Sequence, residues 1–216
     1  ANAAALVQAI QKILCRAVRK EPKLLQPKLV WKAGARLTIT TPPLGGHIHL
    51  SVDNAADAQR LFNPAALYAI DCWVSALEEL VPIHERTYRW DKGYGQRNQW
   101  RSQGPAHMEY RTPSSWLLSP ELAYCFLATA HVAAEAAVEG DLSVLFPQPY
   151  YAQNTDITTR HSMAQLVHLL KKLPASLLVH EQALPQVCQR LSRDFDDGVL
   201  ENRTWTENFI HRWVNI

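Results

Sequence analysis

The stretch that decides the fold is Gly-Gly-His-Ile-His-Leu-Ser, at residues 45–51. Its polar and apolar side chains alternate, which is typical of a strand with one face on the core. Ile48 and Leu50 then point inward. The other face carries two imidazoles and a hydroxyl, from His47, His49 and Ser51. The paired glycines before them allow backbone, substrate or metal to approach closely.

A second short strand, Met108 to Arg111, offers a complementary face. Alternation places Glu109 and Arg111 on the same side. If both faces line one cavity, an imidazole and a carboxylate can ligate a divalent cation. Arginines nearby suit phosphate or carboxylate groups, which they bind in a bidentate manner. Taken separately, each pattern also fits an exposed polar face, a cross-strand ion pair or a solvated basic loop.

The rest of the chain predicts an α+β fold with its strands in the first half. A further strand is expected at 36–40, a turn at 112–115, and a loop or twisted hairpin over 84–103. Capping residues and apolar periodicity predict helices. These are expected over 3–19, up to 61, over 63–80 and 119–140, and near 160–172, 183–193 and 205–213. The Ala-rich face of the helix over 119–140 favours close helix packing.

Composition narrows the class of protein. With 47% hydrophobic residues the chain has enough apolar surface to fold. A formal net charge of +2 gives no reason to expect a nucleic-acid or membrane partner. No segment is expected to span a bilayer, and the first residues do not read as a signal peptide. The four cysteines are far apart and are interpreted as buried free thiols, which suits a cytoplasmic location.

The order of these elements resembles the second half of a glutamine synthetase catalytic domain, and more closely the phage-type amidoligases, the COOH–NH₂ ligases of that superfamily. The resemblance covers roughly residues 1–145. It rests on the strand at 45–51, the connector Lys92-Gly93-Tyr94-Gly95 with Arg101, the stretch Glu109-Tyr110-Arg111-Thr112-Pro113-Ser114-Ser115-Trp116-Leu117, and the helix after it. It implies a glutamine synthetase-like antiparallel sheet packed with helices. On this view residues 1–216 form one partial catalytic domain, with a helical extension from about 147 to 216.

The resemblance implies an ATP-dependent ligase that joins a carboxylate to an amine through an acyl-phosphate intermediate, with Mg²⁺ or Mn²⁺. It makes His47 and Glu109 ligands of one metal ion, and places a nucleotide phosphate at His49. The transferred phosphoryl group is expected at Arg97 and Arg101, with Arg89 as an alternative, and the carboxylate substrate or acyl-phosphate at Arg111. Ser51 and Tyr94 complete the expected ATP and substrate site. The substrates can be amino acids, peptides or protein side chains, and a homo-oligomer is expected.

One departure from the family pattern is large. Further metal-binding glutamates are implied on strands that precede the first helix, whereas no acidic residue precedes Glu21 here. Either the full protein supplies those strands, or the chain as given is inactive. Two other interpretations stay open: a metal-dependent hydrolase that uses the histidines and Glu109 to activate water, and a non-catalytic degenerate homologue.

Overall fold

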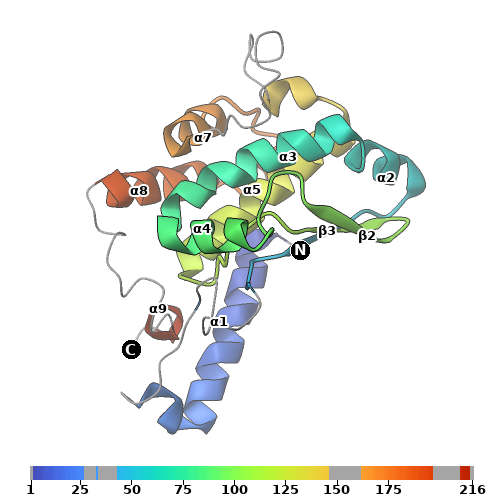
Figure 1. The fold of residues 1–216 in the computed structure, drawn as a ribbon. Coiled ribbons are helices and arrows are strands. Elements are labelled where there is room, and N and C mark those ends of the chain that lie inside the picture. Colours follow the sequence, from blue (N-terminus) through green and yellow to red (C-terminus); the bar gives the residue numbers. More distant parts are fainter. Residues whose placement is uncertain (1, 27–32, 34–42, 146–161, 197–209, 215–216) are drawn as a thin grey trace.

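One long helix, α5 (Pro120–Glu139), lies at the centre of the fold (Figure 1). It contacts four other helices, α1, α2, α3 and α8, and strand β1. The side chain of Ser119 caps its first turn by accepting from the N–H of Leu122, and Gly140 ends it with a φ of 83°. The helix predicted from Ser119 to Gly140 is confirmed. Its small buried residues let neighbouring helices pack closely: Ala123, Ala128, Ala130, Ala133, Ala134, Ala136 and Ala137.

The computed structural model describes residues 2–26, 33, 43–145, 162–196 and 210–214. The strand predicted at 36–40 therefore lies outside the described residues, as do parts of the helices expected near 160–172 and 205–213. The described residues form helices and a small antiparallel sheet, which agrees with the α+β prediction.

Two capped helices follow β1 and pack against α5. Helix α2 (Ala55–Leu61) begins after Asn54, whose side chain accepts from the N–H of Asp57. Helix α3 (Pro64–Ala76) begins after Asn63 and continues as the 3₁₀ turn η2 (Leu77–Leu80). Nearly all of α3 is buried, as the prediction of a core helix requires.

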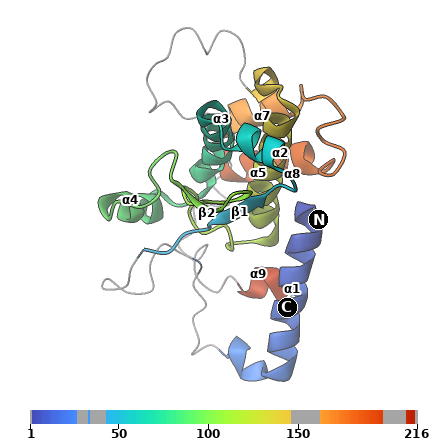
Figure 2. The ribbon, with the colours of Figure 1, turned by 90° about the vertical axis from the view of Figure 1, so that its right-hand side faces the viewer.

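Helix α1 (Ala3–Lys20) extends away from the other helices, as Figures 1 and 2 both show, and the turn η1 (Pro22–Leu25) follows it. Its first part packs on α5, and the short helix α9 (Ile210–Val214) packs beside it. The predicted helix is confirmed, but its predicted apolar stripe is only partly right. Val18 is buried, whereas Leu6 is 46% exposed and Ile13 is 65% exposed.

The C-terminal helices join the same hydrophobic core. The turn η3 (Leu142–Leu145) follows α5, and α7 (Met163–Leu170) and α8 (Leu184–Asp196) pack on each other. Cys188 of α8 and Cys125 of α5 are both buried, with their sulfur atoms 3.3 Å apart. This thiol contact was not predicted, since the two residues are distant in sequence.

Helix α5 is the one described helix with the length and apolar character of a membrane span. By length and mean hydropathy alone, Pro120–Glu139 is apolar enough to span a bilayer, although no such segment was expected. Of its most apolar window, 78% is buried inside the protein. That burial is what a central core helix requires.

Three short strands form the sheet in the order β1–β3–β2, with both pairs antiparallel. They are β1 (Ile48–Ser51), β2 (Trp100–Gly104) and β3 (His107–Tyr110). The register aligns His49, Glu109 and Arg101 across the three strands. A bulge between Ser102 and Gly104 adds one residue to β2. The sheet therefore gathers polar side chains from all three strands on one face.

The opposite face of the sheet belongs to the core. Ile48 is buried there and Leu50 is half-buried, which agrees with the alternating pattern, and Met108 of β3 is buried beside them. The hydroxyl of Tyr110 donates to the carboxylate of Asp71 in α3 at 2.6 Å, which ties the sheet to the helices.

The segment predicted as a loop or hairpin over 84–103 begins instead with a helix, α4 (Ile83–Asp91). Its many arginines and aromatic residues suggested an irregular connector. The helix forms because Arg89 in its last turn is 2% exposed and makes tertiary hydrogen bonds. Gly93, with a φ of 75°, then turns the chain toward β2. Local pattern was overridden by this tertiary contact.

Candidate functional site

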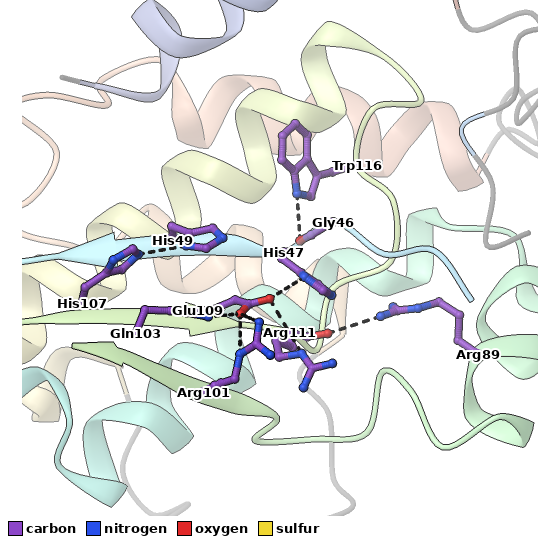
Figure 3. Close-up of polar contacts among 10 residues, drawn as sticks. All are labelled: Gly46, His47, His49, Arg89, Arg101, Gln103, His107, Glu109, Arg111 and Trp116. Carbon is purple, nitrogen blue, oxygen red and sulfur yellow. Dashed lines mark hydrogen bonds and ion pairs between the residues drawn. The ribbon is translucent and has the colours of Figure 1, made fainter. Parts of the chain in front are cut away.

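The carboxylate of Glu109 is the centre of the polar face (Figure 3). Its side chain is 4% exposed, because the side chains around it cover it. One oxygen, Oε2, accepts hydrogen bonds from Arg101 Nε at 2.9 Å and from Gln103 Nε2 at 2.7 Å. The other oxygen, Oε1, lies 2.7 Å from Nδ1 of His47 and 3.9 Å from Nε of Arg111. The structure thus brings together His47, Glu109, Arg101 and Arg111.

The environment shifts the pKa values of both members of the central pair. Burial raises the pKa of Glu109, but hydrogen bonds from Arg101 and Gln103 and the positive charge of Arg101 outweigh it, so the pKa is lowered. Burial lowers the pKa of His47, and the nearby Arg111 charge adds to this, while Glu109 opposes it. A carboxylate beside a neutral imidazole is the state in which both are metal ligands.

Arg111 retains an unused donor. Its Nε is buried and has no hydrogen-bond partner among the described residues, although the side chain as a whole is 32% exposed. Its backbone N–H donates to Gln99 at 2.7 Å, which fixes the chain at this point. A buried N–H without an acceptor is costly, so this donor is available to an anion that enters the site.

Arg89 does not contact Glu109 in the hydrogen bonds described above; its side chain binds the turn after β3. Its guanidinium donates to the carbonyl of Thr112 at 3.0 Å, to Ser114 Oγ at 3.2 Å and to the carbonyl of Arg111 at 3.3 Å. Glu78 is also buried and accepts from the N–H and hydroxyl of Ser114. Burial lowers the pKa of Arg89, and the Glu78 charge opposes this. These contacts hold the turn after β3 and argue against phosphate binding by Arg89.

The paired glycines serve the same turn. A Cβ on Gly46 would lie 2.4 Å from the carbonyl oxygen of Ser114, and one on Gly45 would lie 2.7 Å from Nη2 of Arg89. The Gly46 N–H donates to Pro113, and the Trp116 indole donates to the Gly46 carbonyl at 2.9 Å. The atoms that come close to these glycines therefore belong to the turn after β3 and to Arg89, and not to a substrate or metal.

Other predicted residues make contacts of their own. Arg97 lies beside α3: burial raises the pKa of Tyr68 to about 12 and of Cys72 to about 11, and the Arg97 charge opposes both shifts. Tyr94 is half-buried, and its backbone N–H donates to the backbone carbonyl of Arg89. Ser51 is exposed opposite His107 in the register.

Two residues of the polar face were not predicted. His107 lies on β3, and its Nε2 is 2.9 Å from Nδ1 of His49. The signal was present, since His107, Glu109 and Arg111 alternate in the sequence. Gln103 reaches Glu109 because of the β2 bulge, which sequence alternation does not reveal.

The donor set fits a hard divalent cation. A carboxylate and an imidazole suit Mn²⁺, and Mg²⁺ commonly takes one or two protein ligands and completes its shell with water and phosphate. In the described ranges no group of three or more His, Cys, Asp or Glu side chains gathers to hold a metal. A pocket of about 310 Å³ between β1, α2 and α5 is lined by Ser51 and His131, and Glu109 does not line it.

Comparison with known families identifies the chain. Residues 1–206 match the family described as phage phiEco32-like COOH.NH2 ligase-type 2. The chain belongs to this family. The match confirms the resemblance to phage-type amidoligases, and COOH.NH2 ligases join carboxylates to amines. No curated protein matches this ligase-family chain, and no solved structure matches it. The glutamine synthetase-like architecture of the sheet therefore remains a prediction.

Proposed function

We propose that this chain forms an amide bond between a carboxylate and an amine at the Glu109 face, using ATP. The carboxylate attacks the γ-phosphorus of ATP, giving an acyl phosphate and ADP. The amine then attacks the acyl carbon and its nitrogen loses a proton to water, while phosphate leaves with the electron pair of the broken C–O bond. The proposal rests on family membership together with the arrangement of charged groups around Glu109.

His47 and Glu109 would hold the divalent ion. When bound, Mg²⁺ or Mn²⁺ neutralises charge on the nucleotide phosphates. The 2.7 Å contact between His47 Nδ1 and Glu109 Oε1 brings an imidazole just before β1 next to a carboxylate of β3, and both groups are of types that ligate metals. Burial lowers the pKa of His47, which favours the neutral ring that can act as a ligand.

Arg101 and Arg111 would bind the reacting anions. Arg101 is 57% exposed, so its guanidinium is free to follow a ligand that enters from solvent. Arg111 offers the unused Nε donor described above. We assign Arg101 to the transferred phosphoryl group, and Arg111 to the carboxylate substrate or the acyl phosphate. His49, which is exposed on the same face, would contact a nucleotide phosphate.

The guanidinium groups are the observation that favours a ligase over a metal-dependent hydrolase. Two arginines flank one carboxylate, so the face keeps an excess positive charge suited to phosphate. A hydrolase that polarises a neutral bond gains little from them. Nothing in the structure specifically favours the hydrolase or a non-catalytic role.

The proposal is tested by measuring ADP and phosphate release from ATP and Mg²⁺ with mixtures of candidate acids and amines, using the full-length protein. Release that requires both substrates is expected, with the amide detected by mass spectrometry. The matched variants are Glu109→Gln, which keeps the shape of the side chain, and His168→Ala, which removes an exposed imidazole on α7. Release without an amine, or unaltered activity in Glu109→Gln, would refute the proposal.

A further inference from the structure

The polar face contains a pair of histidines that the proposed reaction leaves unexplained. Nδ1 of His49 on β1 lies 2.9 Å from Nε2 of His107 on β3, and Figure 3 draws this contact beside the Glu109 cluster. The two rings are 5.1 Å apart between centroids and tilted by 56°. In the register, His49 faces Glu109 and His107 faces Ser51, so the contact is a diagonal one across two strands.

This pair is what orients the His49 ring. Among the described residues, neither ring has another hydrogen-bond partner. His49 is otherwise exposed, and an exposed side chain without partners changes rotamer freely. The contact with His107 therefore selects one ring position for His49.

The contact also determines which ring nitrogen carries the proton. A hydrogen bond between two ring nitrogens needs one donor and one acceptor. If His107 Nε2 donates, His49 Nδ1 accepts, and neutral His49 then carries its proton on Nε2. If His49 Nδ1 donates instead, its Nε2 is a bare lone pair. In the first arrangement His49 Nε2 can donate a hydrogen bond to an anion. In the second its lone pair can bind a metal.

The surrounding charge favours the first arrangement. Glu109, which faces His49 across the strands, is flanked by Arg101 and Arg111, so the face attracts anions. We propose that His107 is a positioning residue: it donates from Nε2 to His49 Nδ1, so that His49 Nε2 becomes a hydrogen-bond donor to a phosphate group. That the phosphate belongs to the nucleotide rests on the proposed function.

Two measurements on the same variants test this assignment. The ¹⁵N chemical shifts of the imidazole nitrogens report the tautomer of His49 in the protein without nucleotide, at neutral pH. Calorimetry with a non-hydrolysable ATP analogue and Mg²⁺ reports nucleotide affinity. The variants are His107→Ala, which removes the donor, and His107→Gln, whose amide N–H₂ can replace it. His168→Ala is the matched control, an exposed histidine distant in sequence from the sheet.

The wild-type protein is expected to show His49 with its proton on Nε2. In His107→Ala the His49 shifts should move toward the average of the two tautomers, and nucleotide binding should weaken by about two-fold to about ten-fold, the range of one neutral hydrogen bond. His107→Gln should recover most of both properties, and His168→Ala should retain both.

A wild-type His49 protonated on Nδ1 would overturn the assignment. So would a His107→Ala variant with unchanged His49 shifts and unchanged affinity. The ligase proposal fails separately: if wild-type protein binds no nucleotide, the nucleotide site is wrong, while the ¹⁵N shifts still decide what His107 does to His49.

Discussion

His47 lies immediately before β1, and Nδ1 of its imidazole is 2.7 Å from Oε1 of Glu109 on the neighbouring strand β3. The other carboxylate oxygen is occupied by Arg101 and Gln103. Without a metal, the protein therefore satisfies the Glu109 charge with its own cations. A divalent ion that binds here competes with Arg101 for the same carboxylate, and a phosphate that arrives with the ion can take over the guanidinium.

This competition predicts an unusual effect of Arg101→Met. Removing the guanidinium should tighten Mn²⁺ binding in the absence of nucleotide by up to about five-fold, because Arg101 is 57% exposed and solvent limits its ion pair to about 1 kcal/mol. Binding of the nucleotide–metal complex should weaken instead, since one phosphate contact is lost. Titration calorimetry with Mn²⁺ alone and with the nucleotide complex checks both signs. A weaker Mn²⁺ affinity in Arg101→Met would show that Arg101 does not compete with the metal.

Arg111→Lys should impair turnover more than folding. The Arg111 Nε has no hydrogen-bond partner among the described residues, so the folded state loses little when it is replaced. A single ammonium group, however, cannot reproduce the planar fork that binds a carboxylate. We expect a fall of about tenfold or more in kcat/KM, with the midpoint of urea unfolding almost unchanged. Equal losses of stability and activity would assign Arg111 a structural role.

Arg89→Met should have the opposite result. Its buried guanidinium satisfies acceptors on Thr112, Ser114 and Arg111, and the buried Glu78 lies nearby. Removing the guanidinium leaves these acceptors and the Glu78 carboxylate without their cation, which should lower the free energy of unfolding by about 3 kcal/mol. Arg16→Met, on an exposed position of α1, is the control and should cost almost nothing. Urea unfolding measures both variants, and a stable Arg89→Met protein that fails to bind nucleotide would instead restore Arg89 to the phosphate site.

The lowered pKa of His47 predicts a pH dependence with a defined sign. Because the folded state favours the neutral ring, its contribution to stability is present above the ordinary pKa of 6.5 and is lost as the pH falls through the lowered value. The difference in unfolding free energy between wild type and His47→Gln should therefore shrink as the pH falls below 6.5. An NMR titration should place the His47 midpoint below 6.5. A midpoint above it would mean that Glu109 dominates over burial.

The strand-borne part of the site was predictable from the sequence. Alternation alone put His47 with His49 and Glu109 with Arg111, and the capping residues Asn63 and Ser119 located the two core helices. These features depend on neighbours in sequence, which is why pattern reveals them. That the two strands are neighbours is a tertiary fact, and only the family resemblance suggested it.

The site features that the sequence did not predict also depend on tertiary structure. Arginines in one segment looked equivalent, yet Arg89 is buried beneath the turn after β3, Arg97 lies beside α3, and Arg101 hydrogen-bonds to Glu109. Which arginine faces the site depends on where α4 ends and where β2 begins. The β2 bulge and the His49–His107 contact likewise depend on strand register. No local pattern in the sequence encodes these positions.

The claim that His47 and Glu109 bind one divalent ion is tested most directly by pulsed electron paramagnetic resonance of bound Mn²⁺. Wild-type protein should show the modulation from a directly bound imidazole nitrogen. His47→Ala should abolish that modulation, Glu109→Gln should weaken Mn²⁺ binding by about tenfold or more, and His168→Ala should change neither. Bound Mn²⁺ without a nitrogen signal, or with the same signal in His47→Ala, would contradict the account.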